Sequence, residues 1–192
     1  DAAQAHGSKY KNNNPGYYSD AATLSFYPTK NLGAIGEGGL ILTNNKMIYQ
    51  KTKRMRAWSH KKFNFYELSF NYRMSEFIAA SLNIKIKYLN NDIKKRIKIA
   101  NLYKKNLKIK TFYNFNSKIK IHSYHIFAIR INKDRRKFVL DYLNKKGIQT
   151  NIHYPYSLSE LIFFKKNNIK NKTPNSNIIN RELLSLPIYP EL

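Results

Sequence analysis

One lysine of this chain, Lys30, occupies a position where an amine could do chemistry. It follows the run Ser-Phe-Tyr-Pro-Thr and precedes a loop rich in glycine, with Gly33, Gly36, Gly38 and Gly39. Loops at the ends of strands often carry catalytic residues, and glycine lets the backbone approach a ligand closely. An amine placed there can act as a nucleophile towards a carbonyl group. Composition alone favours a solvated surface lysine, because the chain holds 35 lysines and arginines.

Two short strands and a capped helix are expected to position Lys30. The glycine-rich loop joins the strands, and an asparagine after the second strand can cap the helix. The pattern predicts a loop over 1–20, strands over 22–27 and 39–43, a helix from Asn44 or Asn45 to about Arg56, and irregular chain over 57–72.

The remaining chain is expected to hold two helices and then a small unit of mixed strands and helices. Ser75 is a good N-cap for the first helix, and Asn90-Asn91 is expected to interrupt it before Asp92 restarts a second one. Beyond these helices the pattern predicts a strand over 121–131, a helix capped by Asp134 and closed by Gly147, a strand over 148–152, and helices over 157–165 and 175–184.

The composition is that of a cytoplasmic globular protein. The chain has 192 residues, 42% of them hydrophobic, which suffices for a core. It has no cysteine and no paired His-x-x-x-His, so we expect no disulfide and no metal site. No apolar stretch reaches the roughly 18 residues of a membrane span, and no signal peptide opens the chain.

The formal net charge of +24 raises the alternative of a basic nucleic-acid-binding module. The lysines are spread through every segment together with many asparagines and isoleucines, as AT-rich codons would specify. The densest run, Lys94 to Lys98, falls in a helical pattern and is expected to be a solvated face. No nucleic-acid-binding motif is visible, so we regard nucleic acid as an unlikely partner.

Six blocks of sequence together resemble one known family, the DegT/StrS-type sugar aminotransferases. These are pyridoxal-phosphate enzymes of the aspartate-aminotransferase fold, and the first two blocks together are highly specific. The resemblance covers essentially the whole chain. In chain order the blocks are Asp1-Ala2-Ala3-Gln4-Ala5-His6-Gly7, Ser25-Phe26-Tyr27-Pro28-Thr29-Lys30, Gly36-Glu37-Gly38-Gly39, Asn71-Tyr72-Arg73-Met74, Ile152-His153-Tyr154-Pro155 and Ser185-Leu186-Pro187.

The resemblance implies an α/β protein of pyridoxal-phosphate fold type I. Residues 1–74 would be the C-terminal part of the cofactor-binding large domain, 75–110 connecting helices, and 111–192 a small C-terminal α/β domain. Family members carry a large N-terminal part before the first block, whereas Asp1 opens this chain without an initiator methionine. We therefore expect the chain to be a piece of a longer protein.

Each matching residue then receives an implied role. Lys30 would form the Schiff base with the cofactor aldehyde and shuttle a proton. Asp1 would hold the proton on the cofactor ring nitrogen, and Gln4 would contact the ring hydroxyl side. Ser25 would bind the phosphate, and Asn71 would reach the phosphate of the neighbouring subunit. For each residue the plain alternative is an ordinary structural role: a surface lysine, a terminal or loop aspartate, or a polar capping residue.

Two histidines, His6 and His153, could touch substrate, although a lone histidine is more often a hydrogen-bonded loop residue. The four glycines after Lys30 do not follow the dinucleotide-binding pattern and are expected to serve turns and close packing. The presence of Lys30 argues against the dehydratase branch of the family, which has histidine there.

The resemblance implies a pyridoxal-phosphate-dependent aminotransferase that converts a nucleotide-linked keto-sugar into an amino sugar. Glutamate would be the amino donor, and a homodimer would share its active sites. Two alternatives stay open. The chain could be a catalytically incomplete fragment of such an enzyme, or it could be the nucleic-acid-binding module that its charge suggests.

Overall fold

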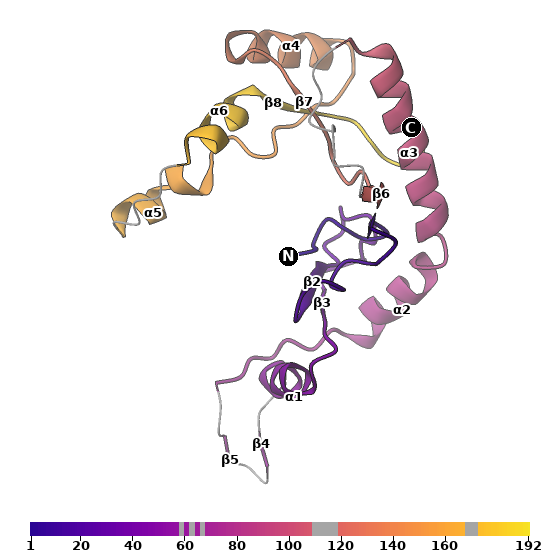
Figure 1. The fold of residues 1–192 in the computed structure, drawn as a ribbon, viewed down its shortest axis with the longest axis vertical. Helices are drawn as coiled ribbons and strands as arrows, with labels where there is room; N and C mark the ends of the chain where they lie inside the picture. The colour runs from indigo at the N-terminus through magenta and orange to yellow at the C-terminus, as the bar shows by residue number, and fades with distance from the viewer. Residues whose placement is uncertain (58–59, 62–63, 66–67, 109–118, 168–172) are drawn as a thin grey trace. The chain divides into compact units, whose positions relative to one another are not determined.

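A computed structural model describes residues 1–57, 60–61, 64–65, 68–108, 119–167 and 173–192. The chain divides into two compact units, each built from two segments of sequence. Unit 1 comprises Asp1–Ile97 with Ser117–His125, and unit 2 comprises Lys98–Asn116 with Ile126–Leu192. Helices and strands are intermixed along the chain, as expected for an α/β protein (Figure 1).

The strands that flank Lys30 form an antiparallel pair in unit 1. Strand β2 (Ala22–Ser25) pairs with β3 (Gly39–Leu42), from Ala22 opposite Leu42 to Ser25 opposite Gly39. Both are slightly shorter than predicted: β2 ends at Ser25, where the chain turns to carry the Lys30 loop, and β3 ends at Leu42, opposite the first residue of β2. A second pair was missed by the sequence reasoning: β1 (Lys9–Tyr10) lies in the predicted loop and pairs with β6 (Ile119–Ile121).

The helices of unit 1 begin at capped positions. Helix α1 (Lys46–Met55) starts after Asn45, whose side chain accepts hydrogen bonds from two backbone amides of the first turn. This selects Asn45 over Asn44 as the cap. Helix α2 (Glu76–Lys85) starts after Ser75 as predicted. Between these helices, β4 (His60–Lys61) pairs with β5 (Asn64–Phe65), while the rest of the predicted irregular stretch lies partly outside the described residues.

The predicted interruption at Asn90-Asn91 is wrong. Helix α3 (Leu89–Asn106) runs through both asparagines, and the break from α2 falls at 86–88. Asparagine weakens helix interiors by competing for backbone hydrogen bonds. In the first turn the backbone N–H groups lack helical partners anyway, so asparagine is tolerated there.

A small apolar core lies beneath the Lys30 loop. The loop residues Phe26, Leu32 and Ala34 are buried together with Leu82 of α2. Partly buried side chains from α2 and its flanks pack against them, namely Met74, Ile78 and Leu89. The apolar face of α2 therefore supports the loop from which Lys30 projects.

Unit 2 is built on a second antiparallel pair, β7 (Phe127–Arg130) with β8 (Leu183–Leu186). Phe127, Ile129 and Leu184 are buried, and the ring of Tyr103 lies 4.9 Å from that of Phe127. Helices α4 (Lys133–Lys145) and α6 (Pro174–Glu182) pack against the pair and against each other, and the 3-10 helix η1 (Leu158–Glu160) contacts α5 (Ile162–Lys166).

Several expectations for the last third of the chain need correction. The predicted strand over 121–131 is two separate strands, β6 and β7, because the chain turns between them. Asn132 rather than Asp134 caps α4. The predicted strand over 148–152 is reduced to an isolated bridge between Asn151 and Ser185. The predicted last helix ends at Glu182, where β8 begins.

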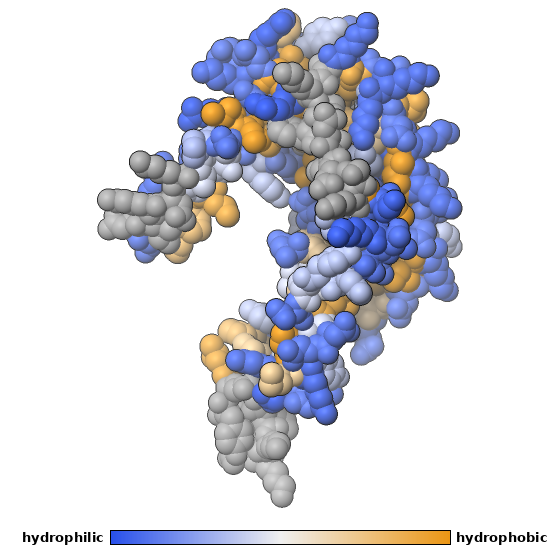
Figure 2. Space-filling model, in the orientation of Figure 1, coloured by the Kyte–Doolittle hydropathy of each residue, from blue (hydrophilic) through white to orange (hydrophobic). Residues whose placement is uncertain are grey.

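The surface is strongly hydrophilic over α3, which carries several lysines (Figure 2). By contrast, all four residues of β3 are exposed, including Leu40, Ile41 and Leu42. In the part of the chain that the structure describes, no helix is both long and apolar enough to cross a bilayer.

Candidate functional site

Lys30 lies in a tight turn whose backbone is fixed by hydrogen bonds. Its amide N–H donates to the carbonyl oxygen of Tyr27 at 2.9 Å. On either side, the Phe26 amide donates to Gly38 O and the Ala34 amide to Phe26 O, each at 2.8 Å. The side chain of Lys30 is half-buried, and it has no hydrogen-bonded or ion-paired partner among the described residues. The turn therefore presents an amine that no carboxylate of the described residues neutralises.

Gly33 is required by the close packing of this turn. A Cβ atom at that position would lie 2.1 Å from the carbonyl oxygen of Pro28, a contact that no side chain can make. The carbonyl oxygen of Gly33 accepts a hydrogen bond from Lys85 Nζ. The predicted turn and close-packing role of the loop glycines thus has a direct geometric basis at Gly33.

The loop that opens the chain is tied to β2. The Ala2 amide donates to the carbonyl oxygen of Thr23 at 2.8 Å, so Asp1 lies beside the strand that leads to Lys30. The Asp1 side chain is exposed, and its Oδ1 accepts a hydrogen bond from the Ala3 amide at 2.9 Å. Gln4 is also exposed.

Ser25 ends β2 opposite Gly39, and its hydroxyl oxygen accepts a hydrogen bond from the Tyr27 amide at 3.3 Å. A half-buried hydroxyl and nearby backbone amides are the donors that a phosphate group requires. Only a short segment separates Ser25 from Lys30. Tyr27 lies in this segment, and its carbonyl oxygen accepts the hydrogen bond from the Lys30 amide.

His6 is buried, with only 4% of its surface exposed. Neither of its ring nitrogens has a hydrogen-bond partner among the described residues. Burial lowers the pKa of His6 below its usual 6.5, and the positive charge of Lys30 lowers it further. Both effects favour the neutral form of the imidazole. A buried polar group without a partner is uncommon in native proteins and calls for an explanation.

The remaining two predicted residues lie in different surroundings. Asn71 is exposed in an extended segment whose neighbours bond to the end of α1: the Phe70 amide donates to Met55 O and the Tyr72 amide to Arg56 O. His153 belongs to unit 2, where its Nδ1 lies 2.9 Å from the hydroxyl oxygen of Ser185. The other predicted site residues all lie in unit 1; they are Asp1, Gln4, His6, Ser25, Lys30 and Asn71.

The sequence reasoning missed the segment Ser123–His125. Its backbone and side chains bond to the first loop and to Asn31, the residue after Lys30. The available signal was the polar run His-Ser-Tyr-His inside a predicted strand. That run breaks the alternation expected of a strand and marks the place where β6 ends.

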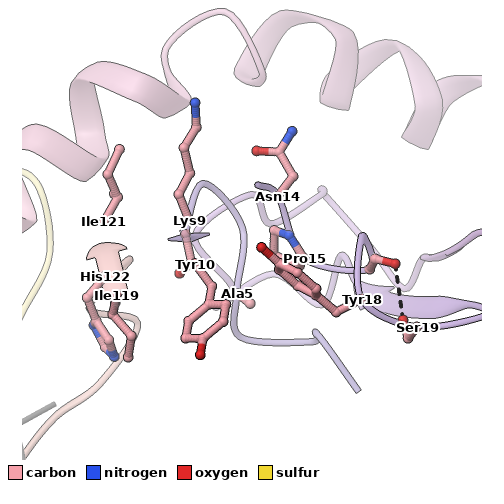
Figure 3. Close-up of a pocket in the computed structure, with 12 residues that line it drawn as sticks. Ala5, Lys9, Tyr10, Asn14, Pro15, Tyr18, Ser19, Ile119, Ile121 and His122 are labelled. Atoms are coloured by element: carbon pink, nitrogen blue, oxygen red, sulfur yellow. Dashed lines mark hydrogen bonds between the residues drawn. The ribbon is translucent and has the colours of Figure 1, made fainter. Parts of the chain in front are cut away.

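A separate hollow of about 340 Å³ lies between β1, β6 and the loop around Pro15 (Figure 3). Lys9 and Tyr10 extend from β1 in opposite directions there, as successive residues of a strand do. Isoleucines of β6 and the ring of Tyr18 complete much of its lining. None of the residues predicted to bind cofactor or substrate lines this hollow. Among the described residues, no group of histidines and carboxylates could hold a metal ion.

Comparison with known proteins finds one family. The family model described as DegT/DnrJ/EryC1/StrS aminotransferase family matches residues 1–192. The chain is 34% identical to the pleiotropic regulatory protein of Geobacillus stearothermophilus over 198 residues, covering all of this chain and 53% of that protein. It is 38% identical to the dTDP-3-amino-3,6-dideoxy-alpha-D-galactopyranose transaminase of Aneurinibacillus thermoaerophilus over 192 residues, covering 99% of this chain and 52% of that one.

Solved structures agree with this match. The structure of DesV from S. venezuelae in complex with a ketimine intermediate has a TM-score of 0.88 and 29% identity, covering all of this chain and 52% of that one. NtdA from Bacillus subtilis with bound PMP has a TM-score of 0.81 and 26% identity, covering 98% of this chain and 45% of that one. The predicted fold class is confirmed. The chain spans about half the length of these relatives.

Proposed function

The chain belongs to the DegT/DnrJ/EryC1/StrS aminotransferase family, and from this premise we propose that its protein transfers an amino group to a nucleotide-linked keto-sugar with pyridoxal phosphate as cofactor. Glutamate is the proposed donor and an amino sugar the product. One observation carries the proposal: the Lys30 amine stands in a braced turn with no carboxylate partner among the described residues. An amine that stabilised the fold by ion pairing would have such a partner.

The residues around Lys30 suit the cofactor chemically. The lysine offers an amine for its aldehyde, and Asp1 beside β2 offers a carboxylate for its ring nitrogen. Ser25 offers a hydroxyl for its phosphate. The ring nitrogens of buried His6, which have no partner among the described residues, lie close enough for the charge of Lys30 to lower the pKa of the imidazole, and they are free to bond to a bound group.

When bound, pyridoxal phosphate supplies an electron sink that stabilises negative charge on the substrate carbon. Lys30 would hold the cofactor through its amine and then carry a proton at Nζ during transfer. Asp1 would keep the ring nitrogen protonated. Gln4 is assigned to the ring hydroxyl side, and His153 to substrate.

We assign two roles to His6. One is the substrate contact expected from the sequence, and the other is packing beside the turn that carries Lys30. Its 4% exposure leaves little surface for a substrate in the described part of the chain. A neutral imidazole adds no second positive charge beside Lys30, so it does not oppose protonation of the Lys30 amine.

We propose a homodimer in which the two subunits share their active sites. Asn71 supports this, because its exposed side chain lies in an extended segment whose backbone is fixed to α1. An exposed amide held in place can donate a hydrogen bond to a phosphate bound by another subunit. A cytoplasmic location is proposed, since the donor and the activated sugar are small soluble metabolites.

The proposal is tested by trapping the cofactor on the natural protein that carries this chain. The protein is mixed with pyridoxal phosphate, reduced with borohydride, digested and mapped by mass spectrometry. We expect the label on the peptide that contains Lys30. The Lys30→Ala variant should lose the label, the visible absorbance band of the bound cofactor and all transamination of glutamate.

The matched control is Lys51→Ala, which removes an exposed lysine of α1. It should keep the label at Lys30, the absorbance band and the activity. Labelling spread over many lysines, or a band that survives in Lys30→Ala, would show that Lys30 does not hold the cofactor.

A further inference from the structure

Ser123 bonds to both loops of the proposed site. It is 2% exposed, and its hydroxyl donates to the carbonyl oxygen of Gln4 at 2.9 Å. Its amide donates to the hydroxyl oxygen of Ser8 at 3.1 Å. Its own carbonyl oxygen accepts a hydrogen bond from the side-chain amide of Asn31 at 2.9 Å. One buried residue thus contacts the loop of Asp1 and Gln4 and the turn of Lys30.

The residues after Ser123 reinforce this arrangement. Tyr124 has a φ of +43°, a left-handed conformation that bulky residues rarely adopt. Its amide donates to His122 Nδ1 at 3.0 Å, and its carbonyl oxygen accepts a hydrogen bond from the buried Arg96 at 3.2 Å. His125 Nδ1 lies 3.3 Å from the side-chain oxygen of Asn31. Such a conformation persists only where its surroundings determine it, and it is found often at functional sites.

We propose that Ser123 is a positioning residue, which sets the place of the Lys30 amine relative to the Asp1 carboxylate by joining their two loops. The inference rests on the proposed function, in which those two groups act on opposite parts of one cofactor. Asn31 links Ser123 directly to Lys30, because it is the next residue in the chain. Its side-chain nitrogen donates to the carbonyl oxygen of Ser123, and its side-chain oxygen lies within hydrogen-bond distance of His125 Nδ1. The Gln4 carbonyl is the link to the first loop.

The proposal explains why these contacts matter for rate. A displacement of about 1 Å between reacting groups can cost on the order of 100-fold in rate. Each loop also has its own anchor, the Ala2–Thr23 bond for the first and the Lys30–Tyr27 bond for the second. Loss of Ser123 contacts should therefore loosen the relation between the loops without unfolding either one.

The first experiment needs no cofactor. Hydrogen exchange is measured on the cofactor-free natural protein and on its Ser123→Ala and Asn31→Ala variants. Ser123→Ala removes only the hydroxyl bond to Gln4 and keeps the amide bond to Ser8, yet we expect faster exchange in the Lys30 turn as well as in residues 2–8. Asn31→Ala cuts only the contact with the turn, yet exchange in residues 2–8 should also rise.

The second experiment measures the cofactor-loaded protein. We expect both variants to shift the pH midpoint of the visible absorbance band of the bound cofactor. We also expect kcat for glutamate to fall about 10- to 100-fold, with KM changed by less than about threefold. The matched control is Ser157→Ala, which removes a buried hydroxyl bonded to Asn177 in unit 2. It should lower stability and leave the pH midpoint unchanged.

The outcomes separate the two proposals. If the wild-type protein does not bind pyridoxal phosphate at Lys30, the proposed function fails, while hydrogen exchange still judges the link between the loops. A different result would overturn the role of Ser123 although the cofactor binds at Lys30. In that case hydrogen exchange would rise only in the loop whose contact was cut, and the pH midpoint of the absorbance band would match that of Ser157→Ala. Should Ser123→Ala fail to fold, the Asn31→Ala variant alone decides by the same criteria.

Discussion

The imidazole of His6 lies against the ring of Phe26, with 5.8 Å between the ring centroids and 39° between their planes. Phe26 belongs to the core beneath the Lys30 loop. His6 thus joins the first loop of the chain to that core by an apolar contact, although its two nitrogens have no partner among the described residues. This combination makes the stability of unit 1 depend on pH.

Acidification is expected to destabilise the protein through His6. The folded-state pKa of His6 lies below the unfolded value of 6.5, so the unfolded chain binds more protons as pH falls through that value. Stability is fully present above about pH 7 and declines on acidification, by at most about 1.4 kcal/mol per pH unit for one proton. Urea unfolding between pH 7.5 and 5 measures the slope. His6→Phe keeps the ring and should flatten it; an unchanged slope in this variant would remove His6 as the cause.

Gly33→Ala is expected to destabilise the Lys30 turn strongly. The new Cβ would meet the backbone of Pro28 at 2.1 Å, and backbone cannot move aside as a flexible side chain can. We expect a loss of about 3 kcal/mol, at the upper end for overpacking, together with weaker cofactor binding. Gly36→Ala is the control, because its nearest neighbour is the flexible end of Ile78 at 3.3 Å. Equal unfolding midpoints for the two variants would contradict the prediction.

Leu184→Ala should leave a cavity in unit 2. Leu184 is fully buried in β8, opposite Ile129 of β7. We expect a loss of about 2–5 kcal/mol, the usual range for such truncations. Leu102→Ala removes a leucine of α3 that is 51% exposed and should cost less than about 1 kcal/mol. Thermal unfolding of both variants tests whether the core lies where the structure has it.

The turn at Lys11 and Asn12 offers a stabilising substitution. Both residues have positive φ, 48° and 76°, and the flanking Tyr10 and Asn13 exchange two backbone hydrogen bonds. Asparagine tolerates this conformation better than lysine does. We expect Lys11→Asn to gain about 0.5 kcal/mol and Lys11→Val to lose about 1–2 kcal/mol. If chemical denaturation shows the same sign of change for both variants, the turn does not have this geometry.

Local signals were predictable from the sequence. Capping chemistry located Ser75 and narrowed the cap of α1 to Asn44 or Asn45, because each cap lies next to the helix that it begins. The Lys30 turn was equally visible, because its proline, lysine and glycines are contiguous. Strand β1 was not predictable, since its two residues form a strand only through pairing with β6, as in Lys9 opposite Ile121. Strand β8 was hidden for the same reason, because its partner β7 lies far back in the sequence.

In the candidate site, too, features set by neighbouring residues were predictable and features set by distant parts of the chain were not. Its motif residues were identified from contiguous blocks, whereas the contacts of Ser123 depend on chain that returns from far away. Burial of His6 was also invisible, because nothing in the sequence distinguishes a histidine that faces solvent from one that faces Phe26. Whether Lys30 holds the cofactor as proposed is decided by the trapping experiment.

The separation of Ser123 from its partners also has a consequence for synthesis on the ribosome. Its hydrogen bonds to Gln4 and Asn31 span 119 and 92 positions. The two loops leave the exit tunnel early, yet neither can be joined to the other until residue 123 has emerged. Closing so large a loop costs chain entropy before any contact rewards it. The lysine-bearing turn should therefore mature late in translation, and a nascent chain halted before residue 123 should not yet hold it in its final place.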